Sequence, residues 1–270
     1  MRTDVRSCSG QPTSREFHHA TSDLGVSGRV RGKHTCFPRV GAGAVARGYA
    51  AAVQKLQFFF DVVSPYAWLG WHELNACRSE LKVEVEAVPT LFGVLLDARG
   101  GVGPAEIPAK RASTFRDVYR CSRLAGLRLA GPPCHPFNPL KAQRLCVAVS
   151  DHEARFRLAG ALLDAAWSEG RDVESEDTLR DILTAQGLGP ELLDAITTPA
   201  IKESLRGCVE RALALGVFGV PTFVLGSELF WGHDRLPHLS AFLRGELDTD
   251  EELIAGILAR PRGVERRGAR

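Results

Sequence analysis

A serine lies where a largely apolar segment meets the start of a predicted helix. Ser64 follows the run FFFDVV at 58–63 and precedes Pro65. Serine is a preferred N-cap because its hydroxyl accepts a backbone N–H, and proline suits the first helical position because it has no N–H. The positive end of a helix favours anions and thiolates. Ser64 is therefore a candidate for stabilising a thiolate, although an ordinary capped helix explains the same pair of residues.

A second unusual segment lies far downstream. Val220 and Pro221 open a predicted strand, within the run GVFGVPTF that begins at Gly216. Proline cannot donate to a strand ladder and is confined to edges, strand starts and bulges. The Val-Pro step therefore indicates a cis peptide bond at a close approach of two chain segments.

The spacing at Ser64 argues against one reaction class. Thiol oxidoreductases need a C-x-x-C pair, in which one thiolate attacks and its neighbour resolves the mixed disulfide. In this chain the two positions are Ser64 and Ala67. We expect no disulfide exchange here unless a cysteine reaches the site from elsewhere.

Four blocks in order resemble the thioredoxin-like fold of the DsbA superfamily. Within it they are similar to the 2-hydroxychromene-2-carboxylate isomerases and the kappa-class glutathione transferases. The blocks are FDVVSPYAWLG from Phe60, GPAEIPAKR from Gly103, HPFN from His135, and GVFGVPTF through ELFWGHD from Gly216 to Asp234. The resemblance covers about Lys55 to Gly245.

The resemblance implies that glutathione is the cofactor and that Ser64 activates it, by donating a hydrogen bond to its thiolate. Val220 and Pro221 are then expected to hold the cysteinyl portion by strand addition. The remaining cofactor-binding residues implied are Trp231, Gly232, His233 and Asp234, with Asp234 placed for the ammonium of the γ-glutamyl group. An alternative is that Asp234 only caps its helix. For His233 a hydrogen-bonding role is favoured over proton transfer.

The resemblance also implies a substrate pocket, to which we assign Tyr66, Asp97 and Asn138. Many relatives have lysine near Asp97 and asparagine near Gly101, so this chain departs from them by replacing a cation with an acid. Other basic candidates are Lys110, Arg111 and Arg116, whose alternative interpretation is a solvated helix surface. Asn138 could equally cap the helix expected to begin at Pro139.

The function implied is a glutathione-dependent cis-trans isomerase acting on an aromatic hydroxy-acid. In this reaction a thiolate adds to a conjugated double bond, the resulting single bond rotates, and elimination returns glutathione. Two alternatives stay open: a kappa-like transferase that releases a thioether, and a non-catalytic binding module on the same scaffold. The kappa-class resemblance further implies a homodimer.

The elements that must position these residues follow from patterning and caps. We expect strands at 55–62, 81–88, 220–225 and 229–231, and helices at 64–79, 175–187, 198–216 and 234–243. The predicted fold class is α/β, a thioredoxin-like fold of the DsbA/kappa type with a large helical insertion. The thioredoxin-like domain takes 55–90 and 208–248, and the inserted helical domain takes 91–207.

Composition fits a cytoplasmic enzyme. The chain has 270 residues, 44% hydrophobic and 24% charged, and a formal net charge of +2. That charge is too small to indicate nucleic-acid or membrane binding. The seven cysteines are scattered, which indicates reduced thiols and no disulfide framework. His72 and His135 have no metal-ligand spacing with any cysteine, so we expect no metal.

The two ends of the chain read differently from the rest. Residues 1–52 lack an apolar period and are expected to be a disordered or non-native extension. A transit peptide is disfavoured by the acidic residues, and a secretory signal by the missing apolar centre. A start site placed too far upstream, with a non-methionine start at Val53, is the preferred interpretation. Residues 260–270 are expected to form a frayed basic tail.

Overall fold

The computed structural model describes residues 54–264. The extension expected at 1–52, the start proposed at Val53 and the end of the tail beyond residue 264 lie outside these described residues. The strands are β1 (Lys55–Phe60), β2 (Glu84–Pro89), β3 (Thr222–Leu225) and β4 (Glu228–Trp231). The helices are α1 (Pro65–Leu81), α2 (Phe92–Ala98), η1 (Pro104–Glu106), α3 (Pro108–Leu124), α4 (Leu140–Ala148), α5 (His152–Trp167), α6 (Glu176–Ala185), α7 (Leu192–Ala195), α8 (Pro199–Ala214), η2 (His233–Arg235), α9 (Leu236–Leu243) and α10 (Glu251–Leu258).

The four strands form one mixed sheet in the order β2-β1-β3-β4. β1 pairs parallel to β2 through the α1 crossover, with Phe58 opposite Ala87. β3 pairs antiparallel to β1, with Phe58 opposite Phe223, and β4 closes the sheet as an antiparallel hairpin partner of β3. This arrangement confirms the predicted α/β thioredoxin-like class.

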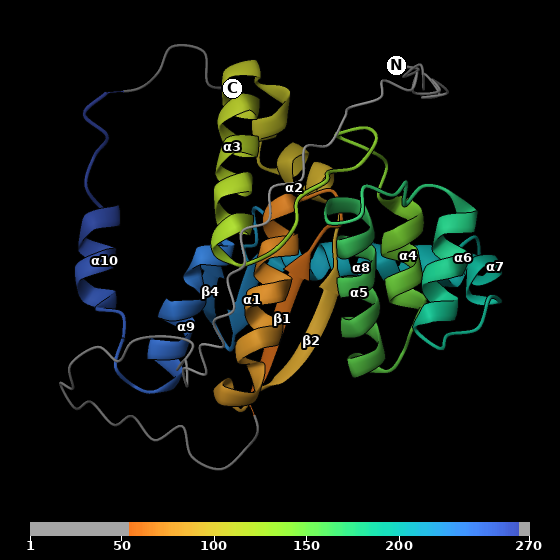
Figure 1. Cartoon of the computed structure of the whole chain (residues 1–270). Helices are drawn as coiled ribbons and strands as arrows, with labels where there is room; N and C mark the ends of the chain where they lie inside the picture. Colours follow the sequence, from red (N-terminus) through yellow and green to blue (C-terminus); the bar gives the residue numbers. More distant parts are fainter. Residues whose placement is uncertain (1–53, 265–270) are drawn as a thin grey trace, which may run out of the picture. The chain divides into compact units, whose positions relative to one another are not determined.

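Alternate residues of the strands supply two cores, because successive strand side chains point to opposite faces. Phe58, Phe60 and Phe223 belong to the larger core, which takes side chains from α1, α4, α5 and α9. Phe59 and Val88 belong to the smaller core, with side chains from α2 and α8. The sheet therefore lies between two groups of helices (Figure 1).

Several element bounds differ from the predicted ones for local reasons. Lys82 adopts a left-handed conformation at φ 54° and ends α1, so β2 begins at Glu84 and not at residue 81. The ladder of β3 begins at Thr222, since Pro221 has no N–H to donate. The predicted helix 234–243 is divided into η2 and α9, and α10 was not predicted.

Between residues 91 and 207, helices α3 to α7 share the larger core with the sheet, whereas α2 contributes to the smaller core. Leu145 of α4 and Trp167 of α5 are fully buried in the same cluster as Phe58 and Phe60. The domain bounds given for this insertion stay a prediction. Along residues 54–264 we find no helix with the length and apolar character needed to cross a membrane.

Candidate functional site

Ser64 caps α1 and faces the loop before β3. Its Oγ accepts a hydrogen bond from Ala67 N–H at 3.2 Å, and Pro65 is the first residue of the helix. The same hydroxyl donates to Val220 O at 3.4 Å. Ser64 is only 7% exposed. The predicted N-cap is therefore present, and the two sequence segments that were singled out meet at this hydroxyl.

The Val220-Pro221 bond is cis, as the sequence predicts. Pro221 packs against α1 at Gly70, where an added Cβ would lie 3.1 Å from Pro221 Cγ and 3.4 Å from His233 Cβ. Pro221 O accepts a hydrogen bond from Gly232 N–H at 2.9 Å, and Gly232 has a φ of 109° that favours glycine. Small residues on both segments thus let α1, the cis-proline loop and the turn after β4 come together.

Tyr66 and His233 stack beside this contact. Their ring centroids lie 5.4 Å apart with planes inclined by 9°. Tyr66 donates its hydroxyl to Asp117 Oδ2 at 2.8 Å, and His233 Nδ1 lies 2.9 Å from Glu73 Oε1. Burial and then the Asp117 carboxylate raise the pKa of Tyr66 well above its ordinary value. Tyr66 therefore stays a neutral hydroxyl at physiological pH.

Asp234 lies at the rim of this group. Its side chain is 57% exposed and pairs with the adjacent Arg235 at 3.3 Å. No side chain caps η2 or α9, so the alternative interpretation of Asp234 as a helix cap is wrong. The helix expected to begin at Asp234 starts instead as a short 3₁₀ turn, in which the Asp234 carboxylate lies beside the Arg235 guanidinium.

Trp231 ends β4 and covers the cis-proline loop from the other side. Its indole packs over the backbone of Gly219, where an added Cβ would lie 2.6 Å from Nε1. Phe218 meets the indole edge to face, with centroids 4.7 Å apart. Both aromatic rings are largely exposed, at 42% for Phe218 and 52% for Trp231. An apolar surface thus adjoins the segment that carries Val220.

The remaining predicted substrate residues lie on α2 and just before α4. Asp97 is exposed near the end of α2. Asn138 is exposed, and its Oδ1 accepts a hydrogen bond from Leu140 N–H at 3.1 Å, which ties it to the start of α4. Of the basic candidates, Lys110 and Arg116 are exposed, whereas Arg111 contacts His135.

The turn that carries Ser64 is held by a buried acid. Asp61 is 1% exposed, and its two carboxylate oxygens accept Val63 N–H at 3.1 Å and Phe92 N–H at 2.8 Å. Burial raises the pKa of Asp61 to about 7, although the two hydrogen bonds oppose the shift. Asp61 thereby joins the turn before Ser64 to the first residue of α2.

The donors and acceptors of this site fit an extended peptide thiol such as glutathione. Val220 precedes the first paired residue of β3, so its backbone lies outside the ladder and can pair with an added strand. Ser64 offers a hydroxyl at a helix N-terminus, and Asp234 offers an exposed carboxylate for an ammonium. Residues 54–264 contain no group of three or more His, Cys, Asp or Glu side chains suited to a metal ion.

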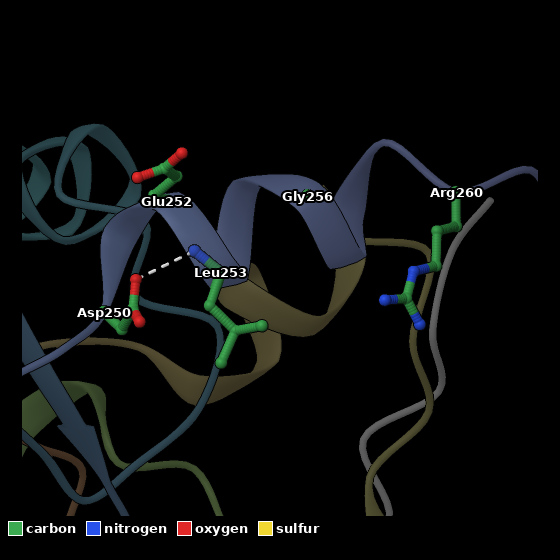
Figure 2. Close-up of a pocket in the computed structure, with 5 residues that line it drawn as sticks. All are labelled: Asp250, Glu252, Leu253, Gly256 and Arg260. Carbon is green, nitrogen blue, oxygen red and sulfur yellow. Dashed lines mark hydrogen bonds between the residues drawn. The ribbon is translucent and has the colours of Figure 1, made fainter.

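A separate pocket runs along α10. Figure 2 shows its lining, which consists of Asp250, Glu252, Leu253, Gly256 and Arg260. Asp250 caps the helix there by accepting Leu253 N–H at 2.9 Å. This pocket shares no residue with the group around Ser64, and we assign the candidate site to Ser64.

Glu73 and Asp117 belong to the site and were missed by sequence reasoning. Tyr66, Gly70 and Glu73 are spaced by four and three residues, so they lie on one face of α1 and could have been grouped by helical periodicity. Asp117 lies on a different helix, 51 residues from the tyrosine that it binds. No spacing in the sequence indicates that pair.

Comparisons with known proteins agree with the fold. The family model described as DSBA-like thioredoxin domain matches residues 55–244. The chain is 26% identical over 210 residues to glutathione S-transferase kappa 1 of Rattus norvegicus, covering 72% of this chain and 92% of the relative. It is 25% identical over 193 residues to 2-hydroxychromene-2-carboxylate isomerase of Sphingobium xenophagum, covering 70% of this chain and 98% of the relative. A solved structure of a 2-hydroxychromene-2-carboxylate isomerase superposes with a TM-score of 0.66 at 22% identity, covering 70% of this chain and 94% of that one.

Proposed function

We propose, from the premise that this chain belongs to the DSBA-like thioredoxin domain family, that it is a glutathione-dependent cis-trans isomerase of the 2-hydroxychromene-2-carboxylate isomerase type. The observation that carries the proposal is the meeting of the Ser64 hydroxyl with Val220 O at the cis proline. Because Ser64 and Ala67 occupy the two positions of a C-x-x-C pair, neither supplies a thiol, and in this proposal the thiol comes from bound glutathione.

Each residue of the site has a task in this proposal. Ser64 donates a hydrogen bond to the bound sulfur and so favours the thiolate form. The long 3.4 Å bond to Val220 O costs little to give up. The backbone of Val220 binds the cysteinyl portion, and Asp234 binds the ammonium of the γ-glutamyl end. Bound glutathione supplies a thiolate that can add reversibly to a conjugated double bond.

The proposal also assigns a substrate class. We propose an aromatic hydroxy-acid, with Tyr66, Asp97 and Asn138 at the substrate side and Trp231 beside the cofactor. The cytoplasmic location and the homodimer likewise stay predictions. Because Asp97 is an acid near a position where the resemblance implies a cation, a kappa-like transferase is kept as a second candidate. The relatives themselves favour neither: kappa transferases match at 26% and 27% identity, isomerases at 25% and 26%.

Two measurements with glutathione near neutral pH test the cofactor site: the ultraviolet absorbance of the bound thiolate, and the binding affinity by titration calorimetry. Ser64→Ala is expected to reduce the thiolate absorbance of the bound cofactor by about tenfold to a hundredfold, since a hydrogen bond to a charged group contributes about 1.5–3 kcal/mol. Asp234→Ala is expected to weaken binding about two- to fivefold, since its carboxylate is exposed and screened.

Thr198→Ala is the matched control for Ser64→Ala. Thr198 caps α8 in the same way, with Pro199 at the first helical position, and lies apart from the site. Glutathione binding by this variant should equal that of the wild type. A wild type that binds no glutathione overturns both the isomerase and the transferase, and leaves the non-catalytic binding module.

Product analysis separates the two enzymes. With an electrophilic haloarene and glutathione, a transferase consumes the thiol and releases a thioether. An isomerase acting on a hydroxychromene carboxylate returns all of the glutathione. We expect the total glutathione to stay unchanged during turnover of the hydroxychromene carboxylate. Thioether formation without isomerisation would contradict the isomerase and support the transferase.

A further inference from the structure

The carbonyl groups leading into Ser64 are each hydrogen bonded. Phe60 O accepts from Gln143 Nε2 at 2.9 Å, Val62 O accepts from Trp167 Nε1 at 2.9 Å, and Val63 O faces His135 Nε2 at 3.0 Å. All three donor side chains belong to the helical region between α3 and α5. The turn that presents Ser64 is thus held from outside the sheet.

His135 binds the peptide group that leads directly into Ser64. On one side of this peptide, Val63 O accepts a hydrogen bond from the His135 imidazole. On the other side, Ser64 N–H donates to Asp61 O at 3.0 Å. With both ends of the peptide plane bonded, rotation of the plane is restrained, and with it the φ of Ser64, which is −94°. The backbone angles of Ser64 limit the χ1 rotamers that it can adopt, and so restrict the direction of its hydroxyl.

Arg111 selects the tautomer of His135. Its Nη1 lies 2.9 Å from His135 O, to which it donates, and 3.5 Å from His135 Nδ1. A guanidinium has only donors, so Nδ1 must be the unprotonated nitrogen. The proton then lies on Nε2, where it is donated to Val63 O. Burial lowers the pKa of His135, which keeps the ring neutral as this arrangement needs.

The surrounding rings fix the imidazole in place. Phe115 and Trp167 meet it edge to face, each with centroids 5.3 Å away. The Arg111 guanidinium lies 5.1 Å over the Phe115 ring and is held there by cation–π attraction. Arg111 is therefore turned inward to the imidazole and away from the solvated helix surface.

We propose that Arg111 and His135 form a positioning pair that aims the Ser64 hydroxyl at the bound thiolate through the Val63–Ser64 peptide group. The inference rests on the proposed function for its thiolate, and on the hydrogen bonds alone for its effect on the turn. His135→Gln keeps a nitrogen donor for Val63 O. His135→Leu removes the donor at similar volume.

Hydrogen exchange tests the effect on the turn without any ligand. In His135→Leu the Ser64 and Val63 amides should exchange at least about tenfold faster than in the wild type, while amides of α8 keep their rates. His135→Gln should restore most of the protection. Arg111→Leu should also accelerate exchange, and Arg120→Leu, an exposed cation on the same helix, should not. Unchanged Ser64 exchange in both His135→Leu and Arg111→Leu overturns the proposal.

Binding of two ligands tests the effect on the thiolate. Glutathione forms a thiolate, whereas S-methylglutathione has no thiol proton. His135→Leu should reduce the thiolate absorbance of bound glutathione at least about fivefold, and should leave the Kd of S-methylglutathione within about twofold of the wild type. An equal loss of affinity for both ligands overturns the positioning role, and so does a full thiolate absorbance in His135→Leu. A wild type that binds neither ligand removes the proposed function, and the exchange result then still decides the role of the pair at the turn.

Discussion

Asp61 and Ser64 show how burial gives neighbouring polar residues different tasks. Ser64 keeps its hydroxyl at the meeting of two segments, where it can turn toward a ligand. Asp61, three residues earlier, is enclosed and binds only backbone amides. Because desolvation opposes its charge, its pKa of about 7 places the protonation change near neutrality. The turn before Ser64 is therefore held by a group that titrates near neutral pH.

Asp61→Asn is expected to change how stability depends on pH. The pKa of Asp61 in the folded state lies above its ordinary value of 3.8, so between about pH 4 and 7 the folded protein binds more protons here than the unfolded chain. This group's stabilisation is therefore complete at low pH and is lost as the pH rises toward 7, with a slope of at most about 1.4 kcal/mol per pH unit. Urea unfolding of the wild type and of Asp61→Asn from pH 4 to 7 measures how the free energy of unfolding depends on pH.

The wild-type curve should fall more steeply with pH than that of Asp61→Asn. Asp181→Asn is the control, since Asp181 is exposed and pairs only at the surface with Arg171. Parallel curves for the wild type and Asp61→Asn contradict the expected pKa.

At the scale of elements, glycines decide how closely helices approach. Gly160 lies in the middle of α5, and a Cβ there would overlap the Trp71 ring of α1. Trp71 is fixed in that place, since its Nε1 donates to Phe156 O at 2.9 Å. The approach of α5 to α1 also lets Asp164 accept hydrogen bonds from Trp68. Helix packing beside the site therefore depends on one missing methyl group.

Gly160→Ala is expected to lower the free energy of unfolding by about 1–3 kcal/mol, because the methyl group overpacks a filled contact. Gly207→Ala in α8 is the matched control, since, apart from the adjoining backbone of its own helix, no atom of residues 54–264 lies within 4 Å of the Cβ it adds. There alanine should raise the free energy of unfolding by about 0.4–1 kcal/mol. Urea denaturation measures both, and a stabilising effect of Gly160→Ala contradicts the packing argument.

At the scale of the described chain, the larger core joins the sheet to most of the helices inserted after β2. Side chains of α1, α4 and α5 meet Phe58 and Phe60 in one buried cluster. By contrast, every residue of α10 is exposed, including Leu253 and Ile257 on its apolar face. α10 also follows the last residue that the family match covers, at 244. Its contribution to the stability of the fold should be small.

Leu253→Ala and Ile257→Ala in α10 are each expected to change the free energy of unfolding by less than about 0.5 kcal/mol. Leu239→Ala in α9 should lower it by about 2–5 kcal/mol, since Leu239 is fully buried. Urea unfolding of the three variants measures the difference. A cost above about 2 kcal/mol for either α10 substitution contradicts the exposure of this helix.

The sequence by itself determined the local features of this protein. The Ser64 cap could be predicted from the sequence because its hydrogen bond joins residues three positions apart. The cap of α8 by Thr198, which precedes Pro199, has the same spacing. The thioredoxin-like class and the unusual Val220-Pro221 bond were also predicted, the first from ordered motifs and the second from the chemistry of proline. Element bounds shifted where a single residue ended an element, as Lys82 does for α1.

Only the tertiary structure decided which distant groups meet. Tyr66 binds Asp117 across 51 residues, His135 binds Val63 across 72, and His233 binds Glu73 across 160. It also turned Arg111 inward to His135. The physical reason is that a cap is set by backbone geometry within one helical turn, whereas these pairs form only after helix and sheet packing brings separate elements into contact.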